Sequence, residues 1–335
     1  MPDKMKQRCV DLIGALGLGD PSDIREVTPL NGGVASDIAR VVVGTNCYCI
    51  KFALEKLRVV EDWHVPVHRS RAEYAWLSVA GRVAPEAAPK LHGFSEKQNG
   101  FVMELVAEPN VRLWKTAMLA GSPVHDEAAR VADVLGRIHA AGAAAEFDRS
   151  PFDNSADFHA IRIEPYLLFT AQRHPTVAPR LLQLSANLDA ARTTLVHGDV
   201  SPKNILFRGD QPILLDAECA SMGDPCFDVA FCLNHLILKS VHLPQSRARL
   251  HQSVLEFWQA YVAHVDWEDP AALQARTAAL LPALMLARID GKSPVEYLSE
   301  PNRVWVRAKA LALLDNPDAQ LSGLVSKLSA DGFTP

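Results

Sequence analysis

The sequence contains no run of basic residues, no secretion signal and no apolar stretch long enough to span a membrane. Its 335 residues carry 34 basic and 39 acidic side chains, so nothing in the charge favours nucleic-acid binding. The N-terminal segment has the pattern of an amphipathic helix and lacks the continuous apolar region of a signal peptide. The longest apolar stretch, residues 278–287, is too short for a membrane helix and contains Pro282. We therefore expect a cytoplasmic protein, with neither nucleic acid nor a membrane as partner.

Cysteine pairs with metal-binding or redox spacing are also missing. The six cysteines are scattered, and no two of them form a C-x-x-C motif. Cys47 and Cys49 alternate on a predicted strand and would share one face of it. We expect the cysteines to be buried, reduced thiols.

What the sequence does contain is a dense group of polar residues between positions 194 and 230. His197-Gly198-Asp199 is followed by Asn204, five residues after the aspartate. The segments 204–207 and 212–215 are typical of two short strands around a turn at 208–211. This hairpin predicts that Asn204 lies beside the residues that directly follow position 215.

The residues after the second strand are Asp216-Ala217-Glu218. The hairpin would bring Asp216 to the same end as Asn204, with Asp199 on the loop before the first strand. Carboxylate and amide oxygens are the ligands that Mg²⁺ prefers. The sequence therefore predicts either a site for such a cation or, less specifically, a turn with solvated carboxylates.

The order and spacing of these residues resemble a phosphotransfer signature. Protein kinases use H-R-D-x-x-x-x-N, followed by a second Asp that binds magnesium. Here Gly198 replaces the Arg, and Asp-Ala-Glu stands in place of Asp-Phe-Gly. With Gly223-Asp-Pro-x-x-Asp228 after them, these motifs resemble the aminoglycoside phosphotransferase and choline-kinase-like family of small-molecule kinases. The resemblance covers about residues 25–240.

The resemblance implies an α+β, bilobal, protein-kinase-like fold, with a small antiparallel-sheet N-terminal lobe at 1–106 and a larger helical C-terminal lobe at 107–335. After an initial helix at 3–17, the sequence pattern predicts N-terminal strands at 25–30, 38–43, 47–52, 90–94 and 100–106, and a helix at 69–80. It predicts later helices at 111–119, 125–140, 157–172, 177–188, 224–239, 245–264, 270–289 and 301–314.

The family pattern also implies where ATP binds. Gly32, Gly33 and Ser36 would form the loop that covers the phosphates, Lys51 would pair with them, and Glu73 would hold Lys51. Glycine suits such a loop because the backbone must approach phosphate oxygens closely. Taken alone, two glycines before a strand are a hairpin turn, and a single lysine or glutamate is solvated.

The adenine would meet the backbone of the hinge, for which the resemblance indicates Met103, Glu104 and Val106. Because backbone groups read the base, the identity of these residues says little. The resemblance gives no role to the segment 54–68.

For catalysis, the resemblance implies that Asp199 orients or deprotonates the acceptor hydroxyl and that Asn204 and Asp216 hold Mg²⁺. Glu218 is a possible second metal ligand. His197 would fix the loop by hydrogen bonds. The function expected is transfer of the γ-phosphoryl group of ATP to a hydroxyl of an amino sugar, an amino alcohol or a sugar-like metabolite. Two alternatives stay open: a kinase-fold binding protein without phosphotransfer, and a nucleotidyl transferase.

The acceptor site is expected among the C-terminal helices, where the sequence is less informative. Gly291-Lys292-Ser293 is not a P-loop, because position 286, where the first Gly of that motif would stand, is Leu. The charged turn after residues 278–287 carries Arg288, Asp290 and Lys292. These three residues would either contact the acceptor or cap the helix, where cations are favoured.

Overall fold

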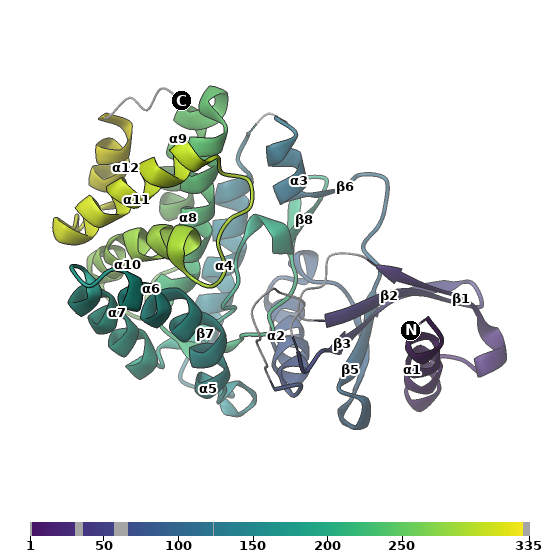
Figure 1. The fold of residues 1–335 in the computed structure, drawn as a ribbon. Helices are drawn as coiled ribbons and strands as arrows, with labels where there is room; N and C mark the ends of the chain where they lie inside the picture. The colour runs from purple at the N-terminus through teal and green to yellow at the C-terminus, as the bar shows by residue number, and fades with distance from the viewer. Residues whose placement is uncertain (1, 31–35, 57–65, 123, 331–335) are drawn as a thin grey trace.

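The chain folds into an antiparallel sheet in its N-terminal part and a helical C-terminal part (Figure 1). This computed structural model describes residues 2–30, 36–56, 66–122 and 124–330. The architecture confirms the predicted α+β, kinase-like fold. The predicted boundary at residue 106 falls between the last strand of the sheet and the first element of the helical part.

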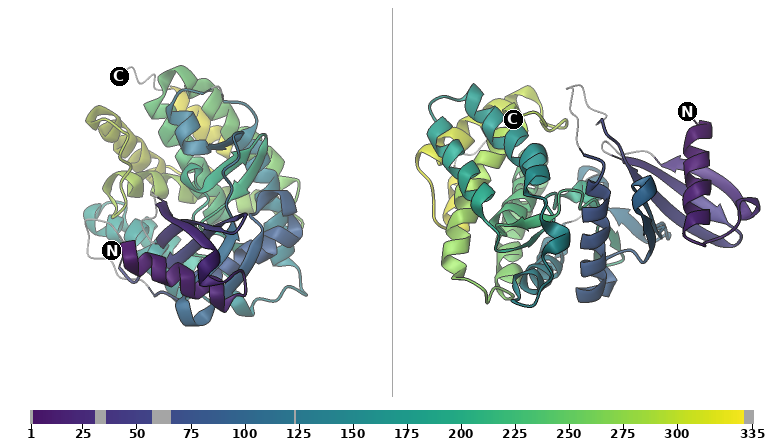
Figure 2. Two further views of the ribbon diagram at one scale, coloured as in Figure 1. Left: turned by 90° about the vertical axis from the view of Figure 1, so that its right-hand side faces the viewer. Right: turned by 90° about the horizontal axis from the view of Figure 1, so that it is seen from below.

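The N-terminal sheet has five strands in the order β1-β2-β3-β5-β4, each antiparallel to its neighbours. The strands are β1 (Ile24–Leu30), β2 (Ser36–Val43), β3 (Asn46–Ala53), β4 (Leu91–Ser95) and β5 (Gly100–Glu104). One face packs against α1 (Pro2–Ala15), and the other against α2 (Arg69–Val83), which lies between the sheet and the helical part (Figures 1 and 2).

The alternation along β3 decides which side of the sheet Lys51 occupies. Ile50 and Phe52 belong to the core shared with α1, while Cys49 packs in the core shared with α2. Because successive side chains of a strand point to opposite faces, Lys51 is directed toward α2 and the helical part.

The C-terminal part surrounds one almost wholly buried helix, α8 (Cys226–His242), which packs against α9 and α10. The other helices are α3 (Trp114–Leu119), α4 (Glu127–Ala143), α5 (Ser155–Phe158), α6 (Phe169–Arg173), α7 (Ala178–Ala190), α9 (Arg247–Val262), α10 (Pro270–Asp290), α11 (Glu300–Asp315) and α12 (Leu321–Ala330). The α10 helix is long and apolar enough to cross a membrane, but 61% of its apolar window is buried inside the protein, as in a core helix.

Two small sheets frame the polar segment 194–230. One has the order β6-β8-β9, with β6 (Val111–Leu113), β8 (Ile205–Arg208) and β9 (Gln211–Leu214). The other pairs β7 (Thr194–Val196) with β10 (Ser221–Gly223). The β8–β9 pair confirms the predicted hairpin.

Several sequence predictions were wrong in detail. Residues 111–113, predicted as the start of a helix, pair with β8 as a strand instead. Residues 159–168, predicted as ordinary helix, form a π-helical segment between α5 and α6. Pro165 lies inside it, and a proline has no N–H for the regular helical bond, so the backbone widens there. Neither β10 nor α12 was predicted, because each is too short to give a clear periodic pattern.

The expectation for the cysteines was largely right. All six are free, and five of them are buried. Cys47 is exposed because it is the second residue of β3, next to the turn, and the buried part of the strand starts one residue later at Tyr48.

Candidate active site

The catalytic loop lies between β7 and β8, and its end is fixed by the hairpin. Ile205 pairs with Leu214, and the backbone N–H of Leu215 donates to the carbonyl of Asn204 at 2.9 Å. Because Asp216 follows Leu215 directly, Asn204 and Asp216 sit at the same end of the hairpin. The geometry that the sequence predicted for these two residues is therefore present.

The front of the loop is held from α8 by Asp228. Its carboxylate accepts the backbone N–H groups of His197 and Gly198 at 2.6 and 2.8 Å, and a ring nitrogen of His139 lies 3.2 Å away. Asp228 is completely buried, so these bonds replace its contacts with water. Asp224 instead binds Arg276 of α10 through both carboxylate oxygens, at 2.8 and 3.1 Å.

Gly198 has two structural reasons to be glycine. Its φ angle is +78°, a left-handed conformation that other residues rarely adopt. A Cβ atom at this position would also lie 2.7 Å from the Cβ of Cys219. The difference from the protein-kinase signature, which has Arg here, therefore reflects the local packing.

Asp199 is buried among three donors. Its carboxylate lies 2.9 Å from a guanidinium nitrogen of Arg162 and 3.0 Å from the Lys203 ammonium, and it accepts the Ser201 hydroxyl at 3.2 Å. Burial alone would raise the pKa of Asp199, but Lys203 and Arg162 outweigh it and hold the pKa below its ordinary value. The carboxylate is therefore ionised at neutral pH and placed to accept or orient a hydroxyl proton.

Arg162 is a site residue that the sequence did not reveal. It lies on the π-helical segment and also donates to the carbonyl of Gly198, so it connects that segment to the catalytic loop. No motif surrounds it. Only a buried arginine in an otherwise apolar helical stretch could have drawn attention to it.

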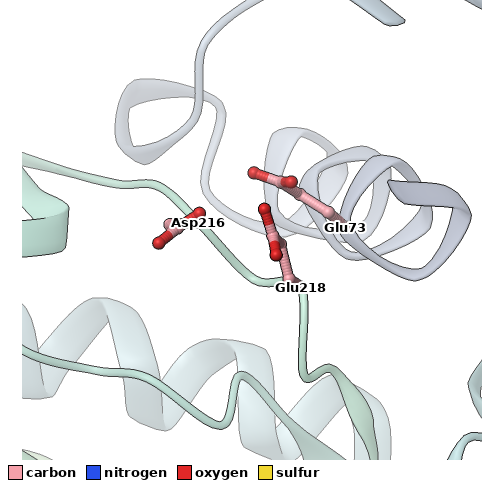
Figure 3. Close-up of side chains that lie close together, drawn as sticks. All are labelled: Glu73, Asp216 and Glu218. Carbon is pink, nitrogen blue, oxygen red and sulfur yellow. The ribbon is translucent and has the colours of Figure 1, made fainter. Parts of the chain in front are cut away.

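A second cluster forms where the sheet meets the helical part, around the Lys51 ammonium. Lys51 lies 2.8 Å from Glu73 of α2 and 3.0 Å from Glu218, and it also pairs with Asp216. The carboxylates of Glu73, Asp216 and Glu218 point toward one another (Figure 3), with oxygens within 4.8 Å. The side chains that the sequence assigned to the nucleotide phosphates and metal are thus brought together from β3, α2 and the segment after β9.

The charges in this cluster shift one another. Burial would lower the pKa of Lys51, but Asp216, Glu218 and Glu73 outweigh it and raise the pKa well above 10.5. Burial raises the pKa of Glu73 to about 8, aided by repulsion from Glu218 and Asp216 and opposed by Lys51. Three carboxylates share one ammonium, so the cluster has room for further positive charge.

Glu218 is the most tightly held of the three carboxylates. One of its oxygens accepts the Ser36 hydroxyl and the other lies 2.7 Å from Nε of Arg69, the first residue of α2. Arg69 is fully buried, and the sequence gave no sign of it beyond its place at the start of a helix. Ser36 and Arg69 therefore attach Glu218 to the N-terminal part from two sides.

The oxygen donors at the end of the hairpin suit a hard cation such as Mg²⁺. Asp216 has a φ angle of +70°, uncommon for a residue with a side chain, and its carboxylate is about one third exposed. The Asn204 amide nitrogen donates to the carbonyl of Asp199 at 3.1 Å, which leaves its oxygen as the free ligand atom. Asn204, Asp216 and Glu218 together offer the amide and carboxylate oxygens that such an ion takes.

The predicted hinge follows the last strand of the sheet. Met103 is buried at the end of β5, and Glu104 contacts Arg208 of β8 and accepts the backbone N–H of Lys90 at 3.0 Å. The N–H of Val106 makes no hydrogen bond to any part of the chain that the structure describes. Gly32 and Gly33, predicted to cover the phosphates, lie outside the described residues.

This arrangement agrees with a match to a known protein family. The model of the phosphotransferase enzyme family (APH) matches residues 26–261, more than half of the chain. The chain belongs to this family. No curated protein sequence matches it significantly. The match spans both the Lys51 cluster and the catalytic loop.

Solved structures show the same fold for this phosphotransferase. A choline/ethanolamine kinase family protein from Mesorhizobium loti is similar with a TM-score of 0.55 at 15% identity, covering 97% of this chain and 99% of the other. An amicoumacin kinase in complex with AMP-PNP, Ca²⁺ and its ligand gives 0.59 at 13% identity, covering 97% and 100%. A choline kinase from Streptococcus pneumoniae gives 0.51 at 15% identity, covering 93% and 99%.

Family membership makes this protein a phosphotransferase, and its fold is the one found in small-molecule kinases such as these. The two alternatives weighed from the sequence, a binding protein without phosphotransfer and a nucleotidyl transferase, gain support from no observation.

In the charged turn at the end of α10, Asp290 and Lys292 form ion pairs within the protein, whereas Arg288 keeps one donor without an acceptor in the described part of the sequence. Asp290 binds Arg307 through both oxygens, each at 2.7 Å, and His174 at 2.9 Å, while Lys292 pairs with Glu164 at 2.8 Å. The Arg288 guanidinium donates to the Ser293 hydroxyl at 2.7 Å, but its Nε is buried without an acceptor. A contact between these residues and the acceptor, as the sequence suggested, stays a prediction.

Proposed function

We propose that the phosphotransferase transfers the γ-phosphoryl group of ATP, bound with Mg²⁺, to a hydroxyl group of a small molecule. The observation that carries the proposal is the pair of clusters around Lys51 and Asp199, which meet at the end of the β8–β9 hairpin. One cluster has the charges that a nucleotide needs, and the other has a buried carboxylate suited to a hydroxyl.

On the nucleotide side, Lys51 would bind phosphate oxygens while Glu73 holds its ammonium in place. The purine would lie against the hinge, where the free N–H of Val106 and the backbone of Met103 and Glu104 are available to the base. Ser36 marks the start of β2, directly after the predicted phosphate loop with Gly32 and Gly33.

Asn204 and Asp216 would hold the metal ion, with Glu218 either as a third ligand or as the anchor for Lys51. When bound, Mg²⁺ neutralises charge on the phosphates. Glu218 already contacts Ser36, Arg69 and Lys51, so we expect its effect on metal affinity to be smaller than that of Asp216.

On the acceptor side, Asp199 would accept a hydrogen bond from the attacking hydroxyl and receive its proton. Phosphoryl transfer passes through a loose transition state, so orientation of the hydroxyl matters more than strong basicity. The lowered pKa of Asp199, held by Lys203 and Arg162 against burial, fits an orienting role.

The experiment that tests the function is an acceptor screen. Purified protein with ATP and Mg²⁺ is incubated with a metabolite library, ADP formation is followed, and products are examined by mass spectrometry. We expect one or more acceptors to gain the mass of a phosphoryl group. A product that carries a nucleotidyl group, or no consumption of ATP with any acceptor, would contradict the proposal.

A further inference from the structure

A buried lysine without a counterion lies on the acceptor side of the catalytic loop. Lys239 belongs to the last turn of α8 and is 1% exposed. No residue in the described ranges accepts a hydrogen bond from its ammonium or forms an ion pair with it; the ammonium rests 5.1 Å from the ring centroid of Tyr297. An isolated buried charge is strongly unfavourable, so a lysine in this position needs a partner from outside the fold.

Two more donors beside Lys239 also lack acceptors. The hydroxyl of Tyr297 and the Nε of Arg288 are both buried without a hydrogen-bond partner among the residues described. The remaining contacts of Arg288 fix its orientation: one terminal nitrogen donates to Ser293 and lies 3.4 Å from the hydroxyl of Tyr166. Unsatisfied buried donors are rare in folded proteins, and two of them beside an ammonium without a counterion indicate a site for an acceptor of hydrogen bonds.

The neighbouring cations Lys115 and Arg288 act on Lys239 more strongly than the carboxylate of Glu296 does. Glu296 pairs with Lys115 of α3, at the outer edge of the group. Burial and then repulsion from Lys115 and Arg288 lower the pKa of Lys239 to about 7. Burial, and then repulsion from Lys239 and Arg288, hold the pKa of His235 well below its ordinary value, so this histidine is neutral. An anion bound here would relieve this repulsion.

The cationic group is within reach of the catalytic aspartate. Phe231, His235 and Lys239 are spaced four residues apart and share one face of α8. The Phe231 ring lies 5.8 Å from the guanidinium carbon of Arg162, which contacts Asp199. Two helical turns separate Phe231 from Lys239, about 12 Å along the axis. Helical side chains lean toward the N-terminus, which brings the ammonium closer to the catalytic loop.

We propose that the acceptor of this phosphotransferase carries an acidic group, a carboxylate or a phosphate, and that Lys239, Arg288 and Tyr297 bind it while Asp199 holds the hydroxyl. The inference rests on the proposed function and names the chemical class of its acceptor. A cationic alcohol would meet like charge at this position, so the site selects against amino alcohols. Asp290 and Lys292 are not part of it, because their charges are matched by Arg307, His174 and Glu164.

The first test compares acceptors that differ only in the acidic group. ADP formation is measured with 6-hydroxyhexanoate against 1,6-hexanediol, gluconate against sorbitol, and glycerol 3-phosphate against glycerol, with choline and ethanolamine as cationic acceptors. The same measurement is made on the acceptors found in the library screen. We expect turnover to favour the acidic member of at least one pair by tenfold or more in kcat/KM. The first two pairs report on a carboxylate and the third on a phosphate. Turnover confined to neutral or cationic acceptors would overturn the inference.

The second test removes the cation without changing the size of the side chain. Lys239→Met should raise the KM for the acidic acceptor at least tenfold and leave the KM for ATP near that of the wild type. Arg288→Gln should act in the same direction, and Lys327→Met, which removes a surface lysine of α12, is the control for lost charge. A KM for the acidic acceptor that stays at the wild-type value in both site variants would contradict the proposal.

A measurement without nucleotide separates this inference from the proposed function. Thermal unfolding is followed with and without 6-hydroxyhexanoate and with and without inorganic phosphate, for wild type and Lys239→Met. We expect one of these anions to raise the unfolding temperature of wild type and not of the variant. Such a shift in a protein that consumes no ATP would refute the kinase proposal and leave the anion site standing. No difference between wild type and variant would overturn the anion site even if ATP is consumed.

Discussion

The nucleotide side and the acceptor side of the catalytic loop balance their charges in opposite ways. Around Lys51, three carboxylates surround one ammonium, and Arg69 supplies a second cation. Around Lys239, the charges of Lys239 and Arg288 have no ion-pair partner among the described residues, and the nearby Glu296 pairs with Lys115. In the first cluster, carboxylates of the protein neutralise the lysine before any ligand binds. In the second, the lysine would be neutralised only by a bound ligand. If the two clusters bind as we propose, the protein pre-organises the nucleotide site, while the acceptor itself supplies the counterion of the acceptor site.

The largest expected effect concerns the residue that lies between the two sides. Asp199→Asn keeps the shape of the side chain but removes the charge that orients the hydroxyl. We expect kcat to fall by about 10²-fold or more, the usual scale for a lost general base. Nucleotide affinity measured by calorimetry should be unchanged. Turnover close to that of the wild type would show that another residue takes the proton.

The next largest effect concerns Asp216, the proposed metal ligand on the nucleotide side. Asp216→Ala should weaken magnesium-dependent nucleotide binding by at least about tenfold, roughly 1.4 kcal/mol, because it removes a carboxylate at the end of the hairpin. Glu218→Gln is the matched variant and should weaken binding less. Calorimetry with and without Mg²⁺ separates the metal from the nucleotide. Equal affinities for wild type and Asp216→Ala in the presence of Mg²⁺ would place the ion elsewhere.

These predictions rest on residues that the sequence found, and the reason is local spacing. Asp199, Asn204, Asp216 and Glu218 lie within twenty positions on one hairpin, so a short pattern determines their arrangement. Lys51 was assigned from its place on the third predicted strand in the family pattern, and alternation along β3 explains why it faces α2. The five-stranded sheet and most helices followed from periodicity in the same way.

The rest of the site could not be predicted because it is assembled from distant segments. Arg69 reaches Glu218 across 149 positions, and Arg162 reaches the catalytic loop from a π-helical segment. Lys239 has ordinary helical neighbours in the sequence, and only the fold shows that its ammonium forms no ion pair within the described part of the chain. Charge matching between remote segments leaves no periodic signal.

The free energies of unfolding of two variants, each lacking one buried cation, test the charge difference between the two clusters. Arg69→Met leaves Glu218 with one charged partner fewer, and breaking a buried ion pair commonly costs about 3–5 kcal/mol. Lys239→Met removes a charge that has no ion-pair partner in the described ranges, so the free energy of unfolding should stay the same or rise. Denaturant unfolding of both variants measures the difference. A larger loss of unfolding free energy for Lys239→Met than for Arg69→Met would show that Lys239, and not Arg69, is the better neutralised cation.

The smallest expected effect is a pH dependence from Glu73. Its pKa is raised from 4.5 to about 8, first by burial, so the folded protein binds a proton that the unfolded chain has released. Stability from this group is therefore full below pH 4.5 and is lost as the pH rises toward 8. The unfolding temperature of wild type should fall more between pH 5 and pH 8 than that of Glu73→Gln. Parallel curves would show that Glu73 is ionised throughout.

The glycine of the His-Gly-Asp motif limits how freely signatures can be exchanged between kinase lineages. A side chain at position 198 would clash with Cys219. Even with a smaller residue at 219, the positive φ angle of position 198 would stay unfavourable for a residue other than glycine. Asp199 already has two cations beside it, Lys203 of the same loop and Arg162 from a different segment of the chain. A chimaera that receives the arginine of the protein-kinase motif would thus acquire a clash and a redundant charge together. The two signatures are separate solutions, and neither can be converted into the other by a single substitution.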